Sequence, residues 1–299
     1  MLAVTILGNN SALPAFDRHP TAQVVTLNEH LFLVDCGEGT QIQIAKYRIR
    51  RSRIQKIFIS HLHGDHYFGL VGLITTMGLL GRENDLHVYG PAELEPIIQL
   101  QLKAGGNHLP FKLQFYTLHD GMTITEDKFE ITCFKVFHRI ECYGFVFREV
   151  RAPRRINPDK IKLYSIPTPY YDWLRWGHDF VSESGEVIAN ELVTEPGSGS
   201  KSYAYAADTL FERSIACRVK GVDLLYHETT YLHDLAEKAT KRFHSTAVQA
   251  ATIAKEAGVH RLIIGHFSSK YEKLDPFEEE AREIFPSTDL ALEGVTYRV

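Results

Sequence analysis

The amino-acid sequence predicts an α/β protein in which β-sheets pack together under helices, with an arm inserted near the middle of the chain. Several short strand-like runs follow one another in the first half, which favours packed sheets over a doubly wound parallel sheet. A histidine-rich loop follows one of these strands. A basic, aromatic and proline-rich stretch then interrupts the pattern, which resumes near residue 202.

Apolar and alternating runs define the elements of the first half. Strands are expected at residues 2–7, 21–27, 31–36, 55–60, 86–89, 112–118, 128–137 and 142–147. Helices are expected after the turn at 37–41, at 67–80 and at about 91–104. The glycines of the 37–41 turn suit a sharp strand-to-helix connection in which the backbone comes close to another group.

The second half alternates strands and helices once the inserted stretch ends. The expected elements are a strand at 202–207, a helix near 210–219, a strand at 223–228, a helix at 247–257, a strand at 261–265, a helix at 275–284 and a strand at 288–297. Thr246 and Gln249 have the spacing of a capping box, and Gly258 is a typical helix stop.

Composition is that of an ordinary globular protein with one large domain or two smaller ones. The 299 residues are 44% hydrophobic and carry a net charge of −4, which alone gives no indication of nucleic-acid binding. No apolar run is long enough to span a membrane, and the start reads as a strand, not a signal peptide. We therefore expect a cytoplasmic protein with reduced thiols at its four cysteines.

Residues 60–66, Ser-His-Leu-His-Gly-Asp-His, hold four potential metal ligands. His61 and His63 are two residues apart at the end of a strand and should point to one side, whereas Asp65 and His66 fall at the start of the next helix. The segment can therefore half-build two adjacent metal sites. The alternative is a polar loop that is rich in histidine by chance, and this spacing favours metal binding over it.

Two metals need more ligands than one loop supplies. His138, Asp208 and His266 each end an apolar strand, where a polar residue is costly to bury unless it is paired or metal-bound. The expected ligands are His61, His63 and His138 for the first metal, Asp65, His66 and His266 for the second, and Asp208 as the bridge. Imidazole and carboxylate together favour two zinc ions, with manganese or iron as alternatives.

Two stretches of the chain are basic. Residues 46–56 hold six cations and no acid, which indicates either a solvated helix end or a phosphate-contacting patch. Residues 148–200 contain both tryptophans, and between 148 and 175 seven cations face three acids. Cations bind phosphates and aromatic faces stack on bases, so this stretch predicts either a nucleic-acid arm or an insertion that packs its own aromatics or a dimer partner.

The His-x-His-x-Asp-His pattern resembles the metallo-β-lactamase superfamily. Further motifs over nearly the whole length make the chain similar to the ribonuclease Z family within it. These motifs are Leu-Gly at 7–8 with Ser11 and Pro14, Val-Asp-Cys-Gly-Glu-Gly-Thr-Gln at 34–41, Tyr-Gly-Pro at 89–91, Ala-Asp-Thr at 207–209, His-Glu-Thr-Thr at 227–230, His-Ser-Thr at 244–246 and His-Phe-Ser-Ser-Lys-Tyr at 266–271.

The resemblance implies an αββα sandwich, with two mixed sheets face to face and helices outside, as one domain over residues 1–299. The arm at 148–200 would bind tRNA. The implied activity is metal-dependent endonucleolytic cleavage of precursor tRNA 3′ of the discriminator nucleotide, which leaves a 3′-hydroxyl on the tRNA and a 5′-phosphate on the trailer. The resemblance also implies a homodimer in which one subunit's arm serves the partner's active site.

The resemblance implies the same seven metal ligands and an acid/base pair of His244 and Glu228 near the leaving group. We expect Asp65 to orient the attacking water and Lys270 to contact the substrate phosphate, at a position where the family more often has arginine. The arm's usual Gly-Pro is represented by Thr168 and Pro169.

Two other functions are compatible with parts of the pattern. One is a small-molecule hydrolase on the same scaffold, such as a lactamase, a thioesterase or a cyclic-nucleotide phosphodiesterase. The other is a non-catalytic RNA-binding or assembly subunit, which the complete set of candidate ligands argues against because an abandoned site loses ligands first.

Overall fold

The first of two large sheets has its strands in the order β20-β1-β3-β4-β5-β6-β7. The computed structural model describes residues 2–106, 108–150, 153–197 and 199–299. The strands are β1 (Leu2–Gly8), β3 (Ala22–Leu27), β4 (His30–Val34), β5 (Ile54–Phe58), β6 (Leu86–Gly90), β7 (Leu113–Thr117) and β20 (Thr296–Arg298). Neighbours from β20 to β4 are antiparallel and those from β4 to β7 are parallel, so the sheet is mixed.

The second large sheet has the order β19-β17-β16-β15-β10-β9-β8. Its strands are β8 (Thr123–Glu126), β9 (Phe129–Lys135), β10 (Tyr143–Glu149), β15 (Ser202–Ala206), β16 (Leu224–Glu228), β17 (Arg261–Gly265) and β19 (Thr288–Leu290). Strands from β15 to β19 are parallel, which brings the carboxyl ends of β15, β16 and β17 to one edge.

Aromatic side chains join the two sheets face to face. The rings of Phe32 in β4 and Phe129 in β9 lie 5.1 Å apart between centroids, and those of Phe58 in β5 and Phe145 in β10 lie 5.2 Å apart. All four are buried in one continuous core that runs through both sheets. Side chains from the two inner faces therefore interdigitate as in a β-sandwich.

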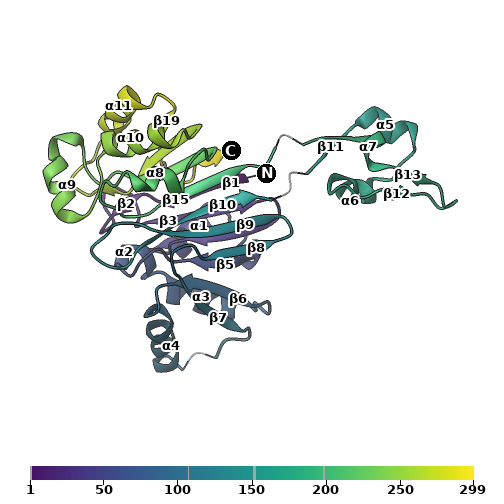
Figure 1. Cartoon of the computed structure of the whole chain (residues 1–299). Coiled ribbons are helices and arrows are strands. Elements are labelled where there is room, and N and C mark those ends of the chain that lie inside the picture. Colours follow the sequence, from purple (N-terminus) through teal and green to yellow (C-terminus); the bar gives the residue numbers. More distant parts are fainter. Residues whose placement is uncertain (1, 107, 151–152, 198) are drawn as a thin grey trace.

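Helices cover the outer face of each sheet (Figure 1). α1 (Thr40–Lys46), α3 (Leu70–Leu79) and α4 (Leu94–Ala104) pack on the first sheet through a second apolar cluster. α8 (Ser214–Arg218), α10 (Ala247–Ala257) and α11 (Asp275–Ile284) lie on the second sheet. The predicted capping box of α10 is present at Thr246 and Gln249, and Gly258 ends that helix in the left-handed conformation. Among the described residues, no helix is long and apolar enough to cross a membrane.

Three sequence-based predictions of secondary structure are wrong in part. The helix expected at 67–80 is α3, which begins only at Leu70, after the separate short helix α2 (Gly64–Tyr67). Between them, the backbone N–H of Gly69 donates to the carbonyl oxygen of Cys36 at 2.9 Å, and an added Cβ at Gly69 would stand 2.2 Å from the carbonyl oxygen of Gly37. The strand expected at 288–297 is divided between β19 and β20, which belong to different sheets. The helix expected near 210–219 is only α8, and the polar strand β8 and helix α9 (Ala236–Arg242) were not predicted.

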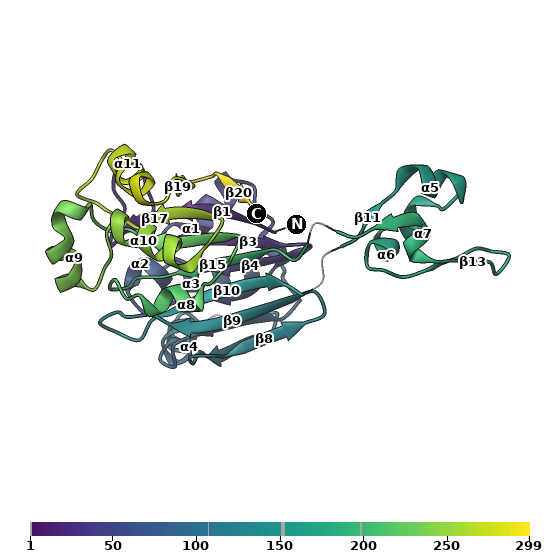
Figure 2. The ribbon, with the colours of Figure 1, turned by 45° about the horizontal axis from the view of Figure 1, so that its top comes forward.

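Residues 153–197 form a lobe beside the sandwich (Figure 1, Figure 2). Its elements are β11 (Arg155–Ile156), α5 (Pro158–Leu163), α6 (Tyr171–Arg175), β12 (Phe180–Val181), β13 (Val187–Ile188), α7 (Asn190–Val193) and β14 (Thr194–Glu195), with a 3₁₀ turn at Thr168–Tyr170. The lobe has a small apolar core of its own, which includes Ile161, Leu174 and Val193.

The lobe covers most of the predicted arm at 148–200. Arg148 and Glu149 complete β10 in the sandwich, and Arg151 lies outside the described residues. Leu2 and Val299 lie on the side of the sandwich that faces the lobe, where both line a cavity together with Arg154 and Arg155. The role of this lobe as a tRNA-binding arm stays a prediction.

Candidate metal centre

The histidine-rich loop leaves the end of β5 and enters α2, and a buried aspartate from the neighbouring strand holds it in place. Asp35, which follows β4, accepts hydrogen bonds from the backbone N–H of Ser60 at 2.7 Å and from its hydroxyl at 2.9 Å. His66 Nδ1 lies 2.8 Å from the same carboxylate. Asp35 therefore fixes both ends of the loop that presents His61 and His63.

His61, His63 and His138 converge as one group of ligand atoms. His63 Nδ1 lies 3.0 Å from His61 Nε2 and 3.2 Å from His138 Nε2. Asp208 completes this group, with its Oδ2 3.7 Å from His61 Nε2. Burial lowers the pKa of His63 to about 4, so its imidazole is neutral, as a metal ligand must be.

Asp65, His66 and His266 form a second group beside the first. Asp65 Oδ2 lies 3.6 Å from His66 Nε2 and 3.4 Å from His266 Nε2. Burial alone would lower the pKa of His66, but the facing carboxylates of Asp208 and Asp65 raise it well above its usual value. These two carboxylates therefore stabilise a positive charge at the second group.

Asp208 lies between the two groups and turns one oxygen to each. Its Oδ2 faces His61, whereas its Oδ1 lies 3.5 Å from His66 Nε2 and 3.3 Å from His266 Nε2. Burial alone would raise the pKa of this carboxyl, but His266 and His66 hold it well below its usual value. Oδ1 is buried and has no hydrogen-bond partner in the described part of the chain. The imidazoles of His66 and His266 lie beside this ionised oxygen but make no hydrogen bond to it, and a bound cation would satisfy it, so these residues fit a metal centre.

The ring nitrogens that point away from the two groups are held by hydrogen-bonding partners. His138 Nδ1 lies 2.9 Å from the carbonyl oxygen of Phe243, and His266 Nδ1 lies 3.0 Å from the Thr230 hydroxyl. Such partners orient each imidazole and direct its other nitrogen toward a metal. Sequence reasoning missed Asp35 and Thr230 in this role, although both lie inside motifs that resemble the ribonuclease Z family.

Glu228 and His244 lie at the edge of the centre, and their role as an acid/base pair stays a prediction. His244 Nδ1 is 3.0 Å from Glu228 Oε1 and 4.0 Å from Asp208 Oδ2. Glu228 is fully buried and also accepts hydrogen bonds from the backbone N–H groups of Ser245 and Thr230. Burial alone would lower the pKa of His244, but Glu228 raises it to about 9, so the imidazole carries a proton at neutral pH.

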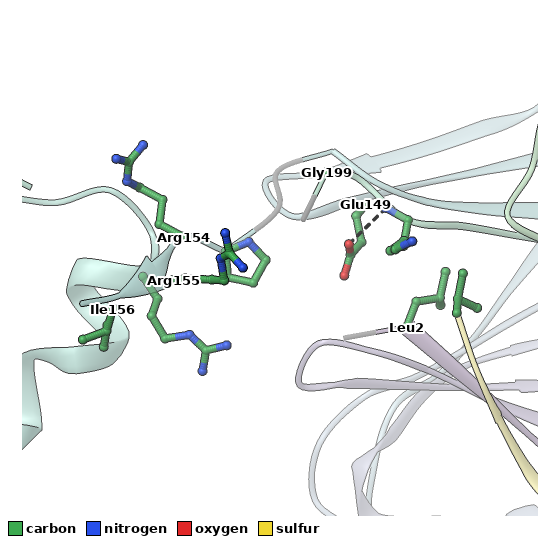
Figure 3. A pocket seen from close by; sticks show the side chains of 10 residues that line it. Leu2, Glu149, Arg154, Arg155, Ile156 and Gly199 are labelled. Atoms are coloured by element: carbon green, nitrogen blue, oxygen red, sulfur yellow. Dashed lines mark hydrogen bonds between the residues drawn. The ribbon is translucent and has the colours of Figure 1, made fainter. Parts of the chain in front are cut away.

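A cavity of about 390 Å³ opens onto these groups, and Asp65, Asp208 and His244 are among the residues that line it. Lys270 is not among them; it is exposed, with its Nζ 5.3 Å from the ring centre of Tyr271. Another cavity lies between the lobe and the sandwich and is lined by Arg154 and Arg155 from the lobe and by Glu149 from the sandwich (Figure 3). It holds none of the predicted ligands.

Full-length relatives identify the family. A protein named Ribonuclease Z from Bacteroides fragilis is 44% identical over 293 residues, which covers 97% of this chain and 96% of that protein. A Ribonuclease Z from Parabacteroides distasonis is 44% identical over 300 residues, with 99% and 98% covered. The chain belongs to the ribonuclease Z family. The predicted family is thereby confirmed.

Solved structures agree with this assignment. Human tRNase Z, short form, has a TM-score of 0.71 and 25% identity, with 99% of this chain and 98% of that chain covered. The metallo-β-lactamase fold protein YhfI from Bacillus subtilis has a TM-score of 0.72 at 19% identity, with both chains fully covered. The predicted fold of two mixed sheets with helices outside is confirmed.

Residues 2–157, just over half of the chain, match the family model described as Anti-Pycsar protein Apyc1, and the chain belongs to that family as well. The match includes the histidine-rich loop but ends before Asp208, His244 and His266. The full-length relatives therefore decide the activity. The chain is a tRNA 3′-processing endonuclease of a family that uses divalent metal, and these relatives do not favour a small-molecule hydrolase.

We predict that Asp35→Ala weakens zinc binding by about 10- to 100-fold, because the loop and His66 lose the carboxylate that orients them. Zinc affinity is measured by competition with a chromogenic chelator. Tyr205→Phe is the matched control, since Tyr205 donates a single hydrogen bond to Asp35 at 2.6 Å and its loss should change affinity far less. Zinc affinity of Asp35→Ala equal to that of the unmodified protein would contradict the assignment.

Proposed function

We propose that the chain cuts precursor tRNA directly 3′ of the discriminator nucleotide, with a 3′-hydroxyl left on the tRNA and a 5′-phosphate on the trailer. One observation carries the proposal: a buried carboxylate, Asp208, turns one oxygen to each of two groups of ligand atoms, with an acid/base pair beside them. An arrangement of this kind can stabilise the attacking and the leaving oxygen of an in-line displacement at a phosphodiester.

We propose two zinc ions per subunit, and manganese or iron would suit the same ligands. His61, His63 and His138 would hold the first, Asp65, His66 and His266 the second, and Asp208 would contact both. Divalent cations at these positions supply Lewis acidity, which lowers the pKa of a water molecule toward neutrality and offsets charge on the phosphate oxygens.

Asp65 is the residue proposed to orient the attacking water and accept its proton. Its Oδ2 accepts a hydrogen bond from the backbone N–H of Ala12 at 2.7 Å, which fixes the carboxylate at the cavity wall. Ala12 follows β2 (Asn10–Ser11), which pairs with β18 (Phe267–Ser268) directly after His266. A bridge between the two sheets thus sets the position of this carboxylate.

His244 is proposed to protonate the departing 3′ oxygen of the discriminator nucleotide. The buried carboxylate of Glu228 holds its Nδ1, so Nε2 remains for the leaving group. Glu228 is in turn fixed by backbone donors and cannot rotate away. Lys270 keeps its proposed role in phosphate contact, although its side chain does not line the cavity.

We propose that the lobe at 153–197 binds the tRNA and that the protein is a cytoplasmic homodimer. The exposed Trp173 and Tyr170 provide aromatic surface beside basic residues of the lobe. Leu2, at the start of β1, lines the cavity next to the lobe, whereas Gly8 at its other end leads toward the metal centre. At about 3.3 Å per residue the strand spans about 20 Å. The lobe is therefore attached to the end of the sandwich that is remote from the metal centre of the same subunit. This position favours a lobe that binds tRNA for the active site of a partner subunit.

The role of His244 predicts a dependence on the leaving group. His244→Ala should lower kcat for an ordinary precursor tRNA by about 10²- to 10⁴-fold, because the 3′ oxygen then departs without a proton. A substrate with sulfur in place of this oxygen should be cut almost as fast by the variant as by the unmodified enzyme, since a thiolate needs no proton. Single-turnover rates on both substrates measure this, and an equal loss on both would contradict the acid role.

The role of the lobe predicts a separation of two activities. The backbone N–H of Glu149 donates to the carbonyl oxygen of Lys201 at 2.8 Å, so the two ends of the lobe can be joined without disturbing β10 and β15. A variant with a short Gly-Ser linker in place of residues 153–197 should lose about tenfold or more in kcat/KM for precursor tRNA. Hydrolysis of bis(p-nitrophenyl) phosphate should be unchanged. Loss of both activities, or of neither, would count against the proposal.

A further inference from the structure

Two residues of the cavity wall have no role in the mechanism described so far. Arg139 is the only arginine or lysine among the described residues that line the cavity, whereas Asp65, Asp208 and Glu38 contribute carboxylates. Phe68 lies on the same wall as Gly64 and Asp65 and is 64% exposed. An RNA chain that enters this cavity is polyanionic and carries unpaired bases, so a cation and an exposed aromatic ring are the two groups it would use.

Arg139 lies next to the first ligand group. It directly follows His138, and its Nε lies 3.1 Å from His63 Nε2, on the side of that ring opposite Nδ1. A cation on Nδ1 would leave the ring proton on Nε2, which then could not accept from Arg139, so the guanidinium would be free to bind another acceptor. The guanidinium therefore lies at the border of the first ligand group and is exposed to solvent. Its planar fork of N–H donors matches two oxygens of one phosphate.

The ring of Phe68 packs against the backbone of Gly64, where any larger residue would clash with it. A Cβ added to Gly64 would stand 2.2 Å from Cε2 of Phe68, so the ring packs directly over the glycine backbone. Tyr67 meets it edge-on, with ring centroids 5.0 Å apart. Phe68 thus packs against Gly64 and Tyr67 on one side, is otherwise exposed to solvent, and lines the cavity together with Asp65.

Two other exposed phenylalanines are close in sequence to proposed site residues. Phe137 precedes His138 and Phe243 precedes His244, and they are 47% and 40% exposed. Single exposed apolar residues are normal on protein surfaces. Of these three phenylalanines, Phe68 is the one that lines the cavity and is therefore placed to stack on a base there.

We propose that Phe68 and Arg139 form a subsite for an unpaired nucleotide next to the scissile phosphate, in which the base stacks on Phe68 and Arg139 binds a flanking phosphate. This subsite rests on the proposed function and specifies the form of substrate that it accepts. A base in a duplex is already stacked on both faces and cannot use the ring, so the subsite selects RNA that is single-stranded at the cleavage point.

The first experiment separates this role from a structural one. The variants are Phe68→Ala, Phe68→Trp, Arg139→Ala and Arg139→Lys, with Lys255→Ala on the exposed face of α10 as the matched control. The readouts are zinc content, hydrolysis of bis(p-nitrophenyl) phosphate, kcat/KM for precursor tRNA, and the affinity of the zinc-loaded protein for a labelled single-stranded 2′-O-methyl pentanucleotide, measured by anisotropy.

Both alanine variants should lose about tenfold or more in affinity for the pentanucleotide and in kcat/KM for precursor tRNA. Their zinc content and their hydrolysis of the small diester should match the control. Phe68→Trp should keep the affinity for the pentanucleotide, because an indole ring also stacks on a base. The affinity of Arg139→Lys should lie between those of Arg139→Ala and the unmodified protein, because lysine keeps the charge but lacks the planar set of N–H donors. Parallel loss of zinc and of small-diester hydrolysis in Arg139→Ala would instead mean that Arg139 only supports His63, and would overturn its part in the subsite.

The second experiment tests the stacked base directly. Precursor tRNAs with an abasic nucleotide on one side or the other of the scissile phosphate are cut by the unmodified enzyme and by Phe68→Ala. For one of the two abasic substrates the unmodified enzyme should lose about tenfold, and Phe68→Ala should lose nothing further, since the interaction is already absent. Independent, multiplying losses for both abasic substrates would overturn the proposal.

These results also distinguish the subsite from the proposed function. If the protein binds the pentanucleotide through Phe68 and Arg139 but does not cut precursor tRNA, the proposed function fails and the subsite stands. If it cuts precursor tRNA and the alanine variants bind and cut like the control, the subsite fails and the proposed function stands. If it neither binds the oligonucleotide nor cuts precursor tRNA, both are overturned.

Discussion

A single buried carboxylate, shared between two groups of histidines, is the interaction on which the rest of this structure depends. Asp208 comes from the second sheet, whereas His61 and His66 follow a strand of the first, so the two sheets must pack in one relative position for its oxygens to face both groups. The aromatic contacts between the sheets provide this position. An ionised oxygen without a hydrogen-bonding partner in the described chain makes the centre a site that gains stability from a cation.

Residues that do not face the proposed metal positions orient the candidate ligands through hydrogen bonds. Tyr205 of β15 donates to Asp35, which follows β4, so one bond across the sandwich joins the two sheets directly beneath the centre. Asp35 then orients His66, while Thr230 bonds both His266 and Glu228. The same hydrogen-bond network therefore fixes the proposed acid and the proposed metal ligands. It sets the position of His244 relative to the ligand groups.

The parts of the site that sequence predicted are those with a local pattern. The spacing of His61, His63 and His66 and the ends of apolar strands select the seven candidate ligands, and their side chains lie together in the structure, which also places His244 beside Asp208 and His266. That these seven residues bind metal stays a prediction. Asp35 and Arg139 were not singled out, because their roles depend on contacts between segments far apart in the chain. The late start of the helix expected at 67–80 was not predicted either, since the contact of Gly69 with the turn at 36–37 lies outside the local apolar pattern.

The central claim is that seven side chains from two sheets enclose two cations on either side of Asp208. Anomalous diffraction from zinc-loaded crystals, recorded on both sides of the zinc absorption edge, tests it most directly. The account predicts two zinc peaks, one contacted by His61, His63 and His138 and the other by Asp65, His66 and His266, with Asp208 touching both. No peak at these residues, or a single peak that Asp208 does not contact, would contradict it.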